Sequence, residues 1–490
     1  MNTLVVVTHP KDWPLKIQNV EVVPARSYLM DSQFDLMRRA KVFNLCRHYK
    51  YQSFGYYVSL LAEARGHKSI PTVMTMQDIR TPAMVRIASD DLMDKIQKSL
   101  AKIQSKKFIL SIYFGQNVAK RHVRLATALF KQFPAPFLQA TFVRNHQWEL
   151  HNITAIPFSA IPDEHKDFVY AAAESFFSRG SLRFANRLNH TRFDLAILWD
   201  PTDITCPSDR VAIEHFTKAA TELGFAVEVI SKEDYGRLAE FDGLFIRATT
   251  AVNHYTYRFS RRAQAEGLIV IDDPISILRC TNKVYLADLL QHNGISTPRT
   301  QILHKGNIRT VIEEIGFPSI LKQPDSSSSQ GVEKANNREE FLTITSRLLK
   351  LSDLLIVQEF LPTDFDWRIG VLNHEPLYAS KYYMAEHHWQ IVKHDNASGN
   401  TDYGLFETIP VEDVPREGLK LALKAANLIG DGLYGVDLKQ IGKKWYVIEV
   451  NDNPSIDSEV EDLVLKEGLY QQVMSVFLHR IELQKKVRAF

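Results

Sequence analysis

The chain has 490 residues, too many for one ordinary hydrophobic core, so we expect two or three domains. Hydrophobic residues make up 45% and charged residues 24%, a balance that is typical of a folded globular protein and excludes a disordered one. The formal net charge of +2 gives no reason to expect a nucleic acid or an acidic membrane surface as a partner.

The cysteines and the apolar segments bear on the compartment. Cys46, Cys206 and Cys280 lie far apart and form no CxxC pair, which argues against a disulfide framework or a zinc site and favours a reducing compartment. The apolar stretch at the N-terminus is short and has no basic leader, so it is predicted to be a buried strand rather than a signal peptide. No stretch approaches the roughly 18 apolar residues that would cross a bilayer. We therefore expect a cytoplasmic protein with no membrane partner.

Residues 1–185 are predicted to form a mixed α/β domain. A polar, basic stretch at 178–192 has no apolar period and is predicted to be a linker. Strands are expected at 4–7, 108–113 and 137–143, and helices at 56–65 and 118–133.

Strands and helices alternate over residues 191–275. Pro207 and Ser208 supply helix start signals, and Gly224 follows the end of that helix. This alternation is typical of a small parallel α/β sheet. Strands are expected at 193–199, 226–230, 243–246 and 268–271, and helices at 209–223 and 257–266.

Residues 276–490 read differently, because strands come in pairs joined by short turns. The pairs are 367–372 with 377–384, and 434–440 with 445–450. Helices are expected at 284–292, 338–349, 417–429 and 469–483. One face of the helix at 417–429 carries Leu419, Ala422, Leu423, Ala426 and Ile429. One face of the helix at 469–483 carries Leu469, Val473, Val476, Phe477 and Ile481. We interpret these faces as core, with an oligomer contact as the alternative for the last helix.

Oxygen-bearing side chains gather on the last strand pair. Glu449 and Asn451 are two residues apart, so they point to the same face. If residues 442–444 form a three-residue loop, Asp437 lies directly opposite Glu449, with Cβ atoms about 5 Å apart. Two carboxylates and an amide oxygen suit Mg²⁺, which keeps waters and substrate phosphates as further ligands. An ordinary exposed strand face is the alternative.

A magnesium site of this kind implies phosphates, and phosphates need cations. Lys283 precedes a helix, and Lys322 ends an apolar strand; for each, a surface charge is the alternative. The loop at 325–332 is rich in small residues, whose backbone N–H groups can surround a phosphate. A flexible loop is the alternative there.

Two further segments complete the predicted pocket. Residues 355–361 read as a strand whose exposed backbone can pair with the edge of an adenine ring. Asp366 and Arg368 begin the next strand, and the planar fork of Arg368 suits phosphoryl or carboxylate oxygens. Lys381 on the following strand is expected to bring a second positive charge to the same pocket. Structural ion pairs explain Arg368 and Lys381 equally well.

The order of these motifs resembles that of the ATP-grasp superfamily, most closely the RimK-type glutamate ligases and more distantly the glutathione synthetases. Residues 241–257 and 269–283 also match the strand–arginine–proline run before the grasp domain of these enzymes. The resemblance covers about residues 193–480, and the preceding residues resemble an extra N-terminal domain of some RimK-like proteins. Its elements, in order, are Lys283, Lys322 with its loop, Gln358 to Leu361, Asp366-x-Arg368, and Asp437 with Glu449-x-Asn451.

The resemblance implies an α/β protein with an α+β ATP-grasp fold. A mixed N-terminal domain (1–185) is followed by a small parallel pre-grasp sheet (191–275) and a two-lobed catalytic domain (276–490). Together with the motifs, the resemblance assigns catalysis to Arg368 and Lys381 and substrate contacts to Arg247 and Asn453. Asp437, Glu449 and Asn451 are expected to bind two Mg²⁺ ions, or Mn²⁺ in their place. The residues assigned to ATP binding are Lys283, Lys322, Ser327, Ser328, Ser329, Gly331, Gln358, Glu359, Phe360, Leu361 and Asp366.

The implied activity is ADP-forming ligation, in which a carboxylate becomes an acyl phosphate and an amine then displaces phosphate. Glutamate or a related amino acid would be added to an amino acid, a peptide or a protein tail, by a homo-oligomer that binds no nucleic acid. A grasp-fold kinase and a nucleotide-binding regulatory protein without turnover are the alternatives. The intact Asp437, Glu449 and Asn451 disfavour the second.

Two departures from the family pattern concern loops. The small-residue loop at 325–332 is rich in serine rather than glycine, and residues 453–457 replace a Pro-Gly turn, which puts the substrate in doubt. We expect residues 326–331 and 387–403 to close over the site and exclude water. Candidates for a general base in the second segment are His387, His388, His394, Asp395 and Asp402, with an exposed polar loop as the alternative.

Overall fold

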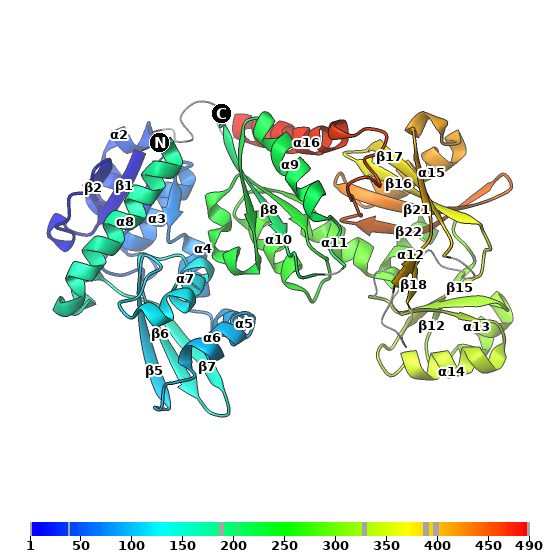
Figure 1. The fold of residues 1–490 in the computed structure, drawn as a ribbon, viewed down its shortest axis with the longest axis horizontal. Helices are drawn as coiled ribbons and strands as arrows, with labels where there is room; N and C mark the ends of the chain where they lie inside the picture. The colour runs from blue at the N-terminus through cyan, green and yellow to red at the C-terminus, as the bar shows by residue number, and fades with distance from the viewer. Residues whose placement is uncertain are drawn as a thin grey trace. The chain divides into compact units, whose positions relative to one another are not determined.

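A computed structural model describes residues 2–37, 40–185, 191–203, 205–325, 331–385, 392–394 and 401–487 (Figure 1). The chain forms two compact units, each described by itself below. The first contains Met1–Thr191 and Ile230–Phe241, and the second contains Arg192–Val229 and Asp242–Phe490. Within the described ranges, no helix is both long enough and apolar enough to cross a membrane.

The first unit contains two sheets. A parallel sheet has the order β2-β1-β3-β4, and an antiparallel sheet has the order β5-β6-β7. The apolar run of β1 is buried on both faces, since Leu4 and Val6 join one core cluster while Val5 and Val7 join another. The strands are β1 (Asn2–Val7), β2 (Val20–Pro24), β3 (Ala40–Asn44), β4 (Lys68–Ile70), β5 (Lys107–Tyr113), β6 (Phe137–Arg144) and β7 (Trp148–Ala155).

Helices cover these sheets, and one of them corrects an expectation. Helix α8 continues through Ala185, so the linker predicted at 178–192 is wrong in its first part. The segment η5 (Lys232–Glu240) belongs to this unit, where Lys131 pairs with Asp234 at 2.8 Å. The helices are α1 (Ala25–Met30), α2 (Ser32–Asp35), α3 (Phe54–Ala64), α4 (Val73–Asp78), α5 (Pro82–Asp91), α6 (Met93–Leu100), α7 (Val123–Gln132) and α8 (Lys166–Ala185), with short 3-10 turns η1 (Pro10–Asp12), η2 (Lys120–His122), η3 (Phe158–Ala160) and η4 (Asp163–His165).

The second unit begins with the small α/β sheet that the sequence predicts. Its order is β11-β10-β8-β9, and β10 pairs in parallel with both β8 and β11. The Asp209 side chain caps the first helix by accepting a hydrogen bond from the Ala212 N–H. The elements are β8 (Phe193–Trp199), α9 (Arg210–Glu222), β9 (Phe225–Ile230), β10 (Gly243–Arg247), α10 (Tyr255–Ala265), β11 (Ile269–Ile271) and α11 (Pro274–Thr281).

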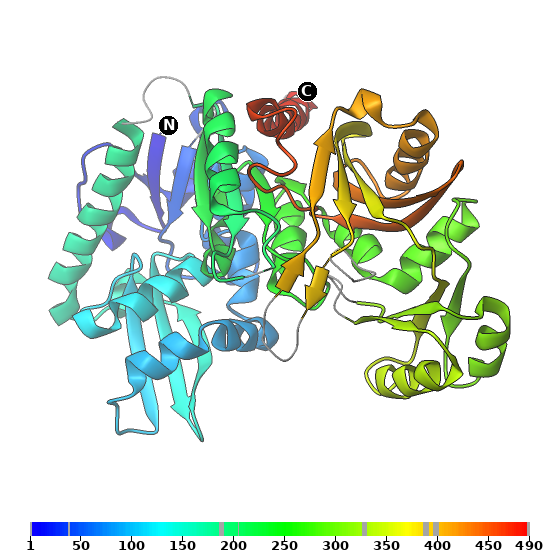
Figure 2. The ribbon, with the colours of Figure 1, turned by 45° about the vertical axis from the view of Figure 1, so that its right-hand side comes forward.

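Two larger antiparallel sheets follow in the same unit, together with a two-stranded antiparallel sheet of β18 and β19. Of the two larger sheets, the smaller has the order β12-β15-β13-β14 and packs against α13 and α14; the larger has the order β20-β17-β16-β21-β22 and packs against α15 (Figure 2). The elements are α12 (Lys283–His292), β12 (Thr300–Leu303), α13 (Ile308–Ile315), β13 (Ser319–Lys322), β14 (Val332–Ala335), α14 (Arg338–Leu348), β15 (Leu355–Glu359), β16 (Phe365–Leu372), β17 (Glu375–Tyr383), β18 (Val392–His394), β19 (Thr401–Tyr403), β20 (Phe406–Ile409), η6 (Val411–Asp413), α15 (Arg416–Asn427), β21 (Leu433–Ile441), β22 (Lys444–Asp452) and α16 (Glu467–Val487).

The C-terminal helix α16 lies against α9 of the small sheet (Figure 1). Leu469, Val473, Phe477 and Ile481 of its predicted apolar face are buried and Val476 is partly buried, with the Phe477 ring 5.6 Å from the Phe245 ring. The same core cluster includes Leu372 and Leu433 of the larger sheet. This helix therefore joins the two sheets within the unit, and its core face is not available for an oligomer contact. The expected homo-oligomer and the division into three domains stay predictions.

Candidate active site

Three predicted metal ligands lie together on one face of the β21–β22 hairpin. Asp437 on β21 lies directly opposite Glu449 on β22, and Asn451 lies opposite Gly435. The Asn451 amide donates to Asp437 Oδ2 at 3.1 Å. The period of a strand therefore brings two carboxylates and one amide to the same place, as expected.

Asp437 and Glu449 come to lie opposite each other through a different turn from the one predicted. Ile441 pairs with Lys444, so the three-residue loop expected at 442–444 is wrong and the turn has two residues. With that turn alone, Asp437 would lie opposite Ile448. A β-bulge inserts Ile448 as an extra residue, so that pairing resumes one residue later.

Arg368 on β16 lies opposite Asp437 on the other side of β21. Its Nε donates to Asp437 Oδ1 at 2.7 Å, and its Nη2 donates to Oδ2 at 2.9 Å. This bidentate pair uses the planar fork that the sequence assigned to charge stabilisation. Arg368 also stacks over Tyr382, with its guanidinium carbon 5.3 Å from the ring centroid.

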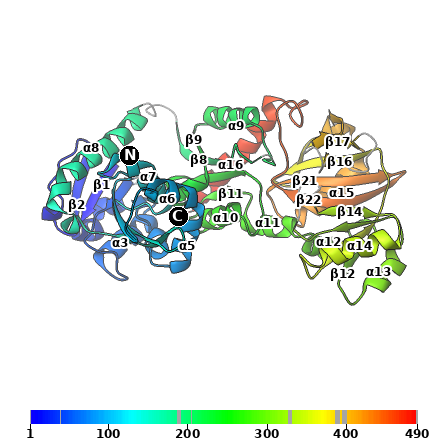
Figure 3. The same ribbon diagram turned by 60° about the horizontal axis from the view of Figure 1, so that its bottom comes forward.

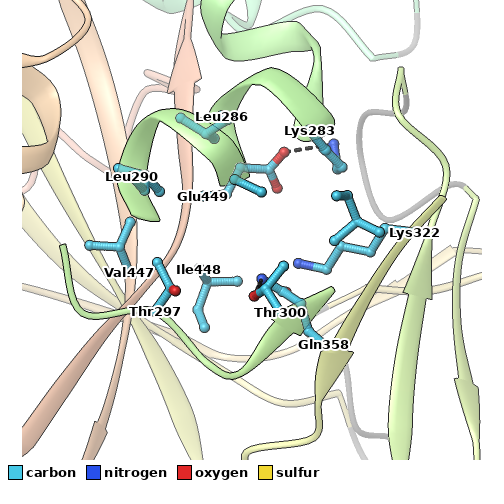
Figure 4. Close-up of a pocket in the computed structure, with 12 residues that line it drawn as sticks. Lys283, Leu286, Leu290, Thr297, Thr300, Lys322, Gln358, Val447, Ile448 and Glu449 are labelled. Carbon is cyan, nitrogen blue, oxygen red and sulfur yellow. Dashed lines mark hydrogen bonds and ion pairs between the residues drawn. The ribbon is translucent and has the colours of Figure 1, made fainter. Parts of the chain in front are cut away.

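A pocket brings four of the predicted residues together (Figure 4). Lys283 at the start of α12, Lys322 at the end of β13, Gln358 on β15 and Glu449 on β22 all line it. Lys283 Nζ lies 2.6 Å from Glu449 Oε1. Apolar and hydroxyl groups form the rest of the wall, namely Leu286, Ala287, Leu290, Thr297, Thr300, Ile356, Val447 and Ile448.

The pocket has excess positive charge. Burial lowers the pKa of Lys322 to about 8, with Glu449 opposing that shift and Lys283 adding to it. Lys322 has no ion-pair partner within 4 Å among the residues that the structure describes. Burial alone would raise the pKa of Glu449, but Lys283 and Lys322 hold it below its usual value. Two lysines thus share one carboxylate, which leaves a net positive charge in position for an anion.

The predicted adenine segment lies partly in this pocket. Gln358 is buried and donates to Thr300 Oγ1 at 3.0 Å, whereas Glu359 pairs with Arg299 at 2.7 Å. The ring of Phe360 lies 3.8 Å from the Lys334 ammonium, and Leu361 follows as a partly exposed residue. Of this segment, Ile356 and Gln358 line the pocket, whereas Glu359, Phe360 and Leu361 are not among its lining residues.

Asp366 and Gly331 lie at the margins of the site. Asp366 is two residues before Arg368 on β16 and therefore shares its face, but its carboxylate accepts from Lys439 at 2.5 Å and from Thr363 at 3.0 Å. Burial raises its pKa. Gly331 has a φ of +67°, a conformation that favours glycine. Its carbonyl accepts from the Gln323 N–H at 2.9 Å.

The expected place of Lys381 beside Arg368 is wrong. Lys381 pairs across β16 with Trp367, the neighbour of Arg368, and therefore points to the opposite face of the sheet. There its ammonium lies 2.8 Å from Glu407 and 5.3 Å from the Trp367 ring.

Arg247 and Asn453, the two predicted substrate contacts, are buried and bonded to protein groups. Arg247 is fully buried at the end of β10 and donates to Ser208 Oγ at 3.0 Å, Asn453 Oδ1 at 2.7 Å, and the carbonyls of Pro207 and Pro454 at 2.5 and 2.8 Å. Asn453 donates in turn to the Ala248 carbonyl at 2.7 Å. These bonds fasten the chain after β22 to the small sheet, and the substrate contacts of Arg247 and Asn453 stay a prediction.

Several predicted positions lie outside the described residues. They are the loop serines Ser327, Ser328 and Ser329, most of the segment 387–403 expected to close over the site, and the side chains of the general-base candidates within it. The ATP-binding role of the serines, the closure of the segment and the general base therefore remain predictions. Sequence reasoning missed Thr300, Tyr382 and the bulge at Ile448, although alternation along β16 and β17 is a signal that points to Tyr382.

The donor set at the hairpin fits a magnesium ion in chemical type, because two carboxylates and an amide oxygen are hard ligands. Both Asp437 oxygens accept from Arg368, and Glu449 Oε1 accepts from Lys283. Positive groups thus already lie where a cation would bind, and a metal ion would compete with the Arg368 fork for the Asp437 oxygens. In the part of the chain that the structure describes, no group of three or more His, Cys, Asp or Glu side chains is placed to hold a metal.

Comparisons with known proteins identify both halves of the chain. Residues 25–172 match the family model described as a RimK-like ATPgrasp N-terminal domain, and residues 280–466 match that of a RimK-like ATP-grasp domain. A probable alpha-L-glutamate ligase of Vibrio vulnificus is 25% identical over 224 residues, which are 45% of this chain and 71% of the relative. The alpha-aminoadipate–LysW ligase LysX of Saccharolobus solfataricus is 27% identical over 254 residues, 49% of this chain and 87% of the relative.

Among solved structures, a D-alanine–D-alanine ligase from Bacillus anthracis aligns with a TM-score of 0.48 at 15% identity, covering 61% of this chain and 99% of that one. The two family matches together span more than half of the chain, and the second contains Lys283, Lys322, Gln358, Arg368, Asp437, Glu449 and Asn451. The chain therefore belongs to the RimK-like ATP-grasp family and is a ligase of the carbon–nitrogen bond type.

Proposed function

We propose that this ligase is ADP-forming, activating a carboxylate as an acyl phosphate and joining it to an amine in a peptide-type amide bond. One observation carries the proposal. Two buried lysines, one carboxylate and a glutamine from α12, β13, β15 and β22 line a single pocket, and Asp437, which pairs with Arg368 of β16, lies on the hairpin that supplies Glu449.

ATP fits this pocket in chemical terms. The triphosphate would contact Lys283 and Lys322, whose ammonium groups give the pocket its net positive charge. The adenine ring would lie along the end of β15 near Gln358, between apolar side chains such as Leu290 and Ile356. Apolar walls with a few polar groups are typical of small-molecule sites.

Asp437, Glu449 and Asn451 would hold Mg²⁺, or Mn²⁺ in its place, and two ions are expected. A bound ion supplies charge neutralisation on the transferring phosphoryl group. When Arg368 releases Asp437, its guanidinium is free to turn toward phosphoryl oxygens on the same face of the sheet. In this proposal, Asp437 holds the Arg368 guanidinium until Arg368 acts on the substrate.

The proposed reaction has two steps. The carboxylate oxygen of one substrate attacks the γ-phosphorus of ATP, and ADP leaves. The amine of the second substrate attacks the carbonyl carbon of the acyl phosphate, loses a proton, and phosphate leaves as the amide forms. Arg368 and Lys322 would stabilise the oxygens that carry charge in both steps.

The relatives indicate the substrate class. One is named an alpha-L-glutamate ligase and the other an alpha-aminoadipate–LysW ligase. We propose that this chain likewise adds glutamate or a related amino acid, and that its acceptor is an amino acid, a peptide or a protein tail.

The test is ADP release with ATP and Mg²⁺ and a panel of amino-acid pairs, with the product identified by mass. The proposal expects ADP release to depend on both an amino-acid carboxylate and an amine, with a product that lacks one water relative to the pair. ADP release with a phosphorylated product and no need for an amine would instead indicate a kinase. ATP binding without any turnover across the panel would favour a regulatory protein.

A further inference from the structure

Tyr382 of strand β17 is a second partner of the Arg368 guanidinium. The strands β17, β16, β21 and β22 lie side by side in that order (Figure 3). Tyr382 pairs with Asp366, two residues before Arg368 on β16, so Tyr382 and Arg368 point to the same face of the sheet. The guanidinium carbon lies 5.3 Å from the centroid of the Tyr382 ring. The guanidinium thus contacts this ring as well as the Asp437 carboxylate.

A buried carboxylate holds the other end of the Tyr382 side chain. The Tyr382 hydroxyl donates a hydrogen bond to Glu461 Oε1, and the Asp457 N–H donates to Glu461 Oε2 at 2.8 Å. Glu461 is 1% exposed. Burial raises its pKa to about 7, while the bonds from Tyr382 and Asp457 and the charge of Arg368 oppose that shift. The reaction proposed above gives this carboxylate no role.

The segment that carries Glu461 is fastened to the same sheet. Tyr378 of β17 donates to the Ser455 carbonyl at 3.1 Å, and Thr408 of β20 donates to the Val460 carbonyl at 2.7 Å. Both donors lie on the face of the sheet that carries the site, because they alternate in step with it along their strands. The fold therefore fixes the carboxylate behind the aromatic ring.

An aromatic ring is suited to an arginine that has to change partners. In the proposed reaction Arg368 leaves Asp437 and contacts phosphoryl oxygens, so its N–H donors must become free. A ring face attracts the guanidinium through its π-electrons and leaves the donors in the guanidinium plane available for oxygen acceptors. A phenol that donates to a carboxylate has a more electron-rich ring, and the same bond restricts rotation of the side chain.

We propose that Tyr382 and Glu461 are positioning residues for Arg368, an inference that rests on the proposed function. The ring keeps the guanidinium at the site both while it pairs with Asp437 and while it contacts phosphoryl oxygens. Glu461 fixes the ring and places a negative charge behind it, which balances part of the guanidinium charge when Asp437 binds the metal ion. Neither positioning residue is expected to touch the substrate.

The first test is the turnover number and the KM for ATP, measured by ADP release. We expect Tyr382→Leu to lower turnover about tenfold, because a cation–π contact to a reacting group is lost, and to leave the KM within about twofold. Tyr382→Phe and Glu461→Gln keep the ring and should each lower turnover about threefold. Tyr383→Leu is the matched control, since Tyr383 points to the opposite face and donates to Glu407 at 3.2 Å. It should leave both constants within about twofold.

The Arg368→Met background separates positioning from structural damage. If Tyr382 acts through Arg368, Tyr382→Leu should lower the residual turnover by less than about twofold in that background. A residue with a merely structural role would lower turnover equally in both backgrounds, and that result would overturn the proposal. A raised KM for ATP with unchanged turnover would also overturn it.

Hydrogen exchange of the Arg368 Nε–H gives a readout that does not depend on ligase activity. It is followed by NMR of the full chain with isotope-labelled arginine and without substrates, and the signal is assigned by its absence in Arg368→Met. We expect exchange to be about tenfold faster in Tyr382→Leu, because the ring holds the guanidinium on Asp437, and to stay within about twofold in Tyr383→Leu. If Tyr382→Leu fails to fold, Tyr382→Phe should still show exchange about threefold faster than the unaltered chain.

Equal exchange rates in the Tyr382 variants and the unaltered chain would overturn the positioning role, whatever the turnover. Absence of ADP release from the unaltered chain would refute the proposed function instead. The exchange rates would then still decide whether Tyr382 positions Arg368.

Discussion

Arg368 and Asp437 form a bidentate ion pair across β16 and β21, with donor–acceptor distances of 2.7 and 2.9 Å. The predicted metal ligand is therefore held by the predicted catalytic residue. If Asp437 holds a metal ion as proposed, metal binding and the Arg368 pair would compete, because both use the same two oxygens.

Arg368→Met removes the group that competes for Asp437. We expect Mn²⁺ to bind about tenfold more tightly without nucleotide, since a charge-assisted pair no longer has to be broken. Ligase turnover should nevertheless fall by about 100-fold or more, because a donor to the developing charge is lost. Mn²⁺ affinity is measured by electron paramagnetic resonance titration, and turnover by ADP release.

Lys381→Met is the matched control, since it removes one positive charge from the opposite face of the same sheet. It should leave both Mn²⁺ affinity and turnover within about threefold of the unaltered protein. Unchanged Mn²⁺ affinity in Arg368→Met would contradict the proposed competition.

The pH dependence of nucleotide binding should report on Lys322, whose pKa burial lowers to about 8. Phosphate binding favours the charged ammonium and raises this pKa, so affinity is constant below about pH 8 and then weakens up to about tenfold per pH unit. Calorimetric titration with a non-hydrolysable ATP analogue at pH 7, 8 and 9 measures this. Lys322→Met should bind the ATP analogue more weakly at pH 7, and its affinity should no longer depend on pH in this range. If Lys322→Met kept the same pH profile, the titrating group would be another residue.

Glu449→Gln keeps the shape of the side chain and removes its charge. We expect turnover to fall about 1,000-fold, because a charged metal ligand is lost. Metal-free nucleotide should bind at least as tightly as before, because the Glu449 charge beside Lys283 and Lys322 opposes the phosphates. ADP release and metal-free binding titrations separate the two effects.

Glu407→Gln is the control, because that carboxylate pairs with Lys381 on the opposite face. Near-normal ADP release by Glu449→Gln would remove Glu449 from the metal site.

The sequence predicted which residues of one strand point to the same face. Two bulges, however, decide which residues of neighbouring strands lie on the same face of the sheet. At Ile448 a bulge returns Glu449 to its place opposite Asp437 and so preserves a prediction that rested on the wrong turn length. At Leu377 a second bulge shifts the pairing of β17, so that Arg368 faces Ser380 and Lys381 faces Trp367. Without it, Lys381 would share the face of Arg368. A one-residue shift exchanges the faces of a strand, and no local pattern marked either bulge.

The buried position of Arg247 could not be predicted for a different reason. A residue at the carboxyl end of a parallel strand is a reasonable candidate for a ligand contact, because binding crevices form there. Its actual partners, Pro207 and Pro454, come from segments far apart in the sequence. Only tertiary structure shows that they enclose the guanidinium, so periodicity and motif order could not predict these bonds.

Arg247→Met should therefore act on stability rather than on substrate recognition. The substitution leaves the Asn453 amide oxygen and the carbonyls of Pro207 and Pro454 without a buried donor. We expect a loss of about 3 kcal/mol in the free energy of unfolding, measured by urea titration, since each unsatisfied buried acceptor carries a desolvation cost. Arg210→Met, at an exposed pair with Glu214 in the same unit, should cost less than about 0.5 kcal/mol. If Arg247→Met kept its stability and instead raised KM for an amino-acid substrate, Arg247 would contact that substrate after all.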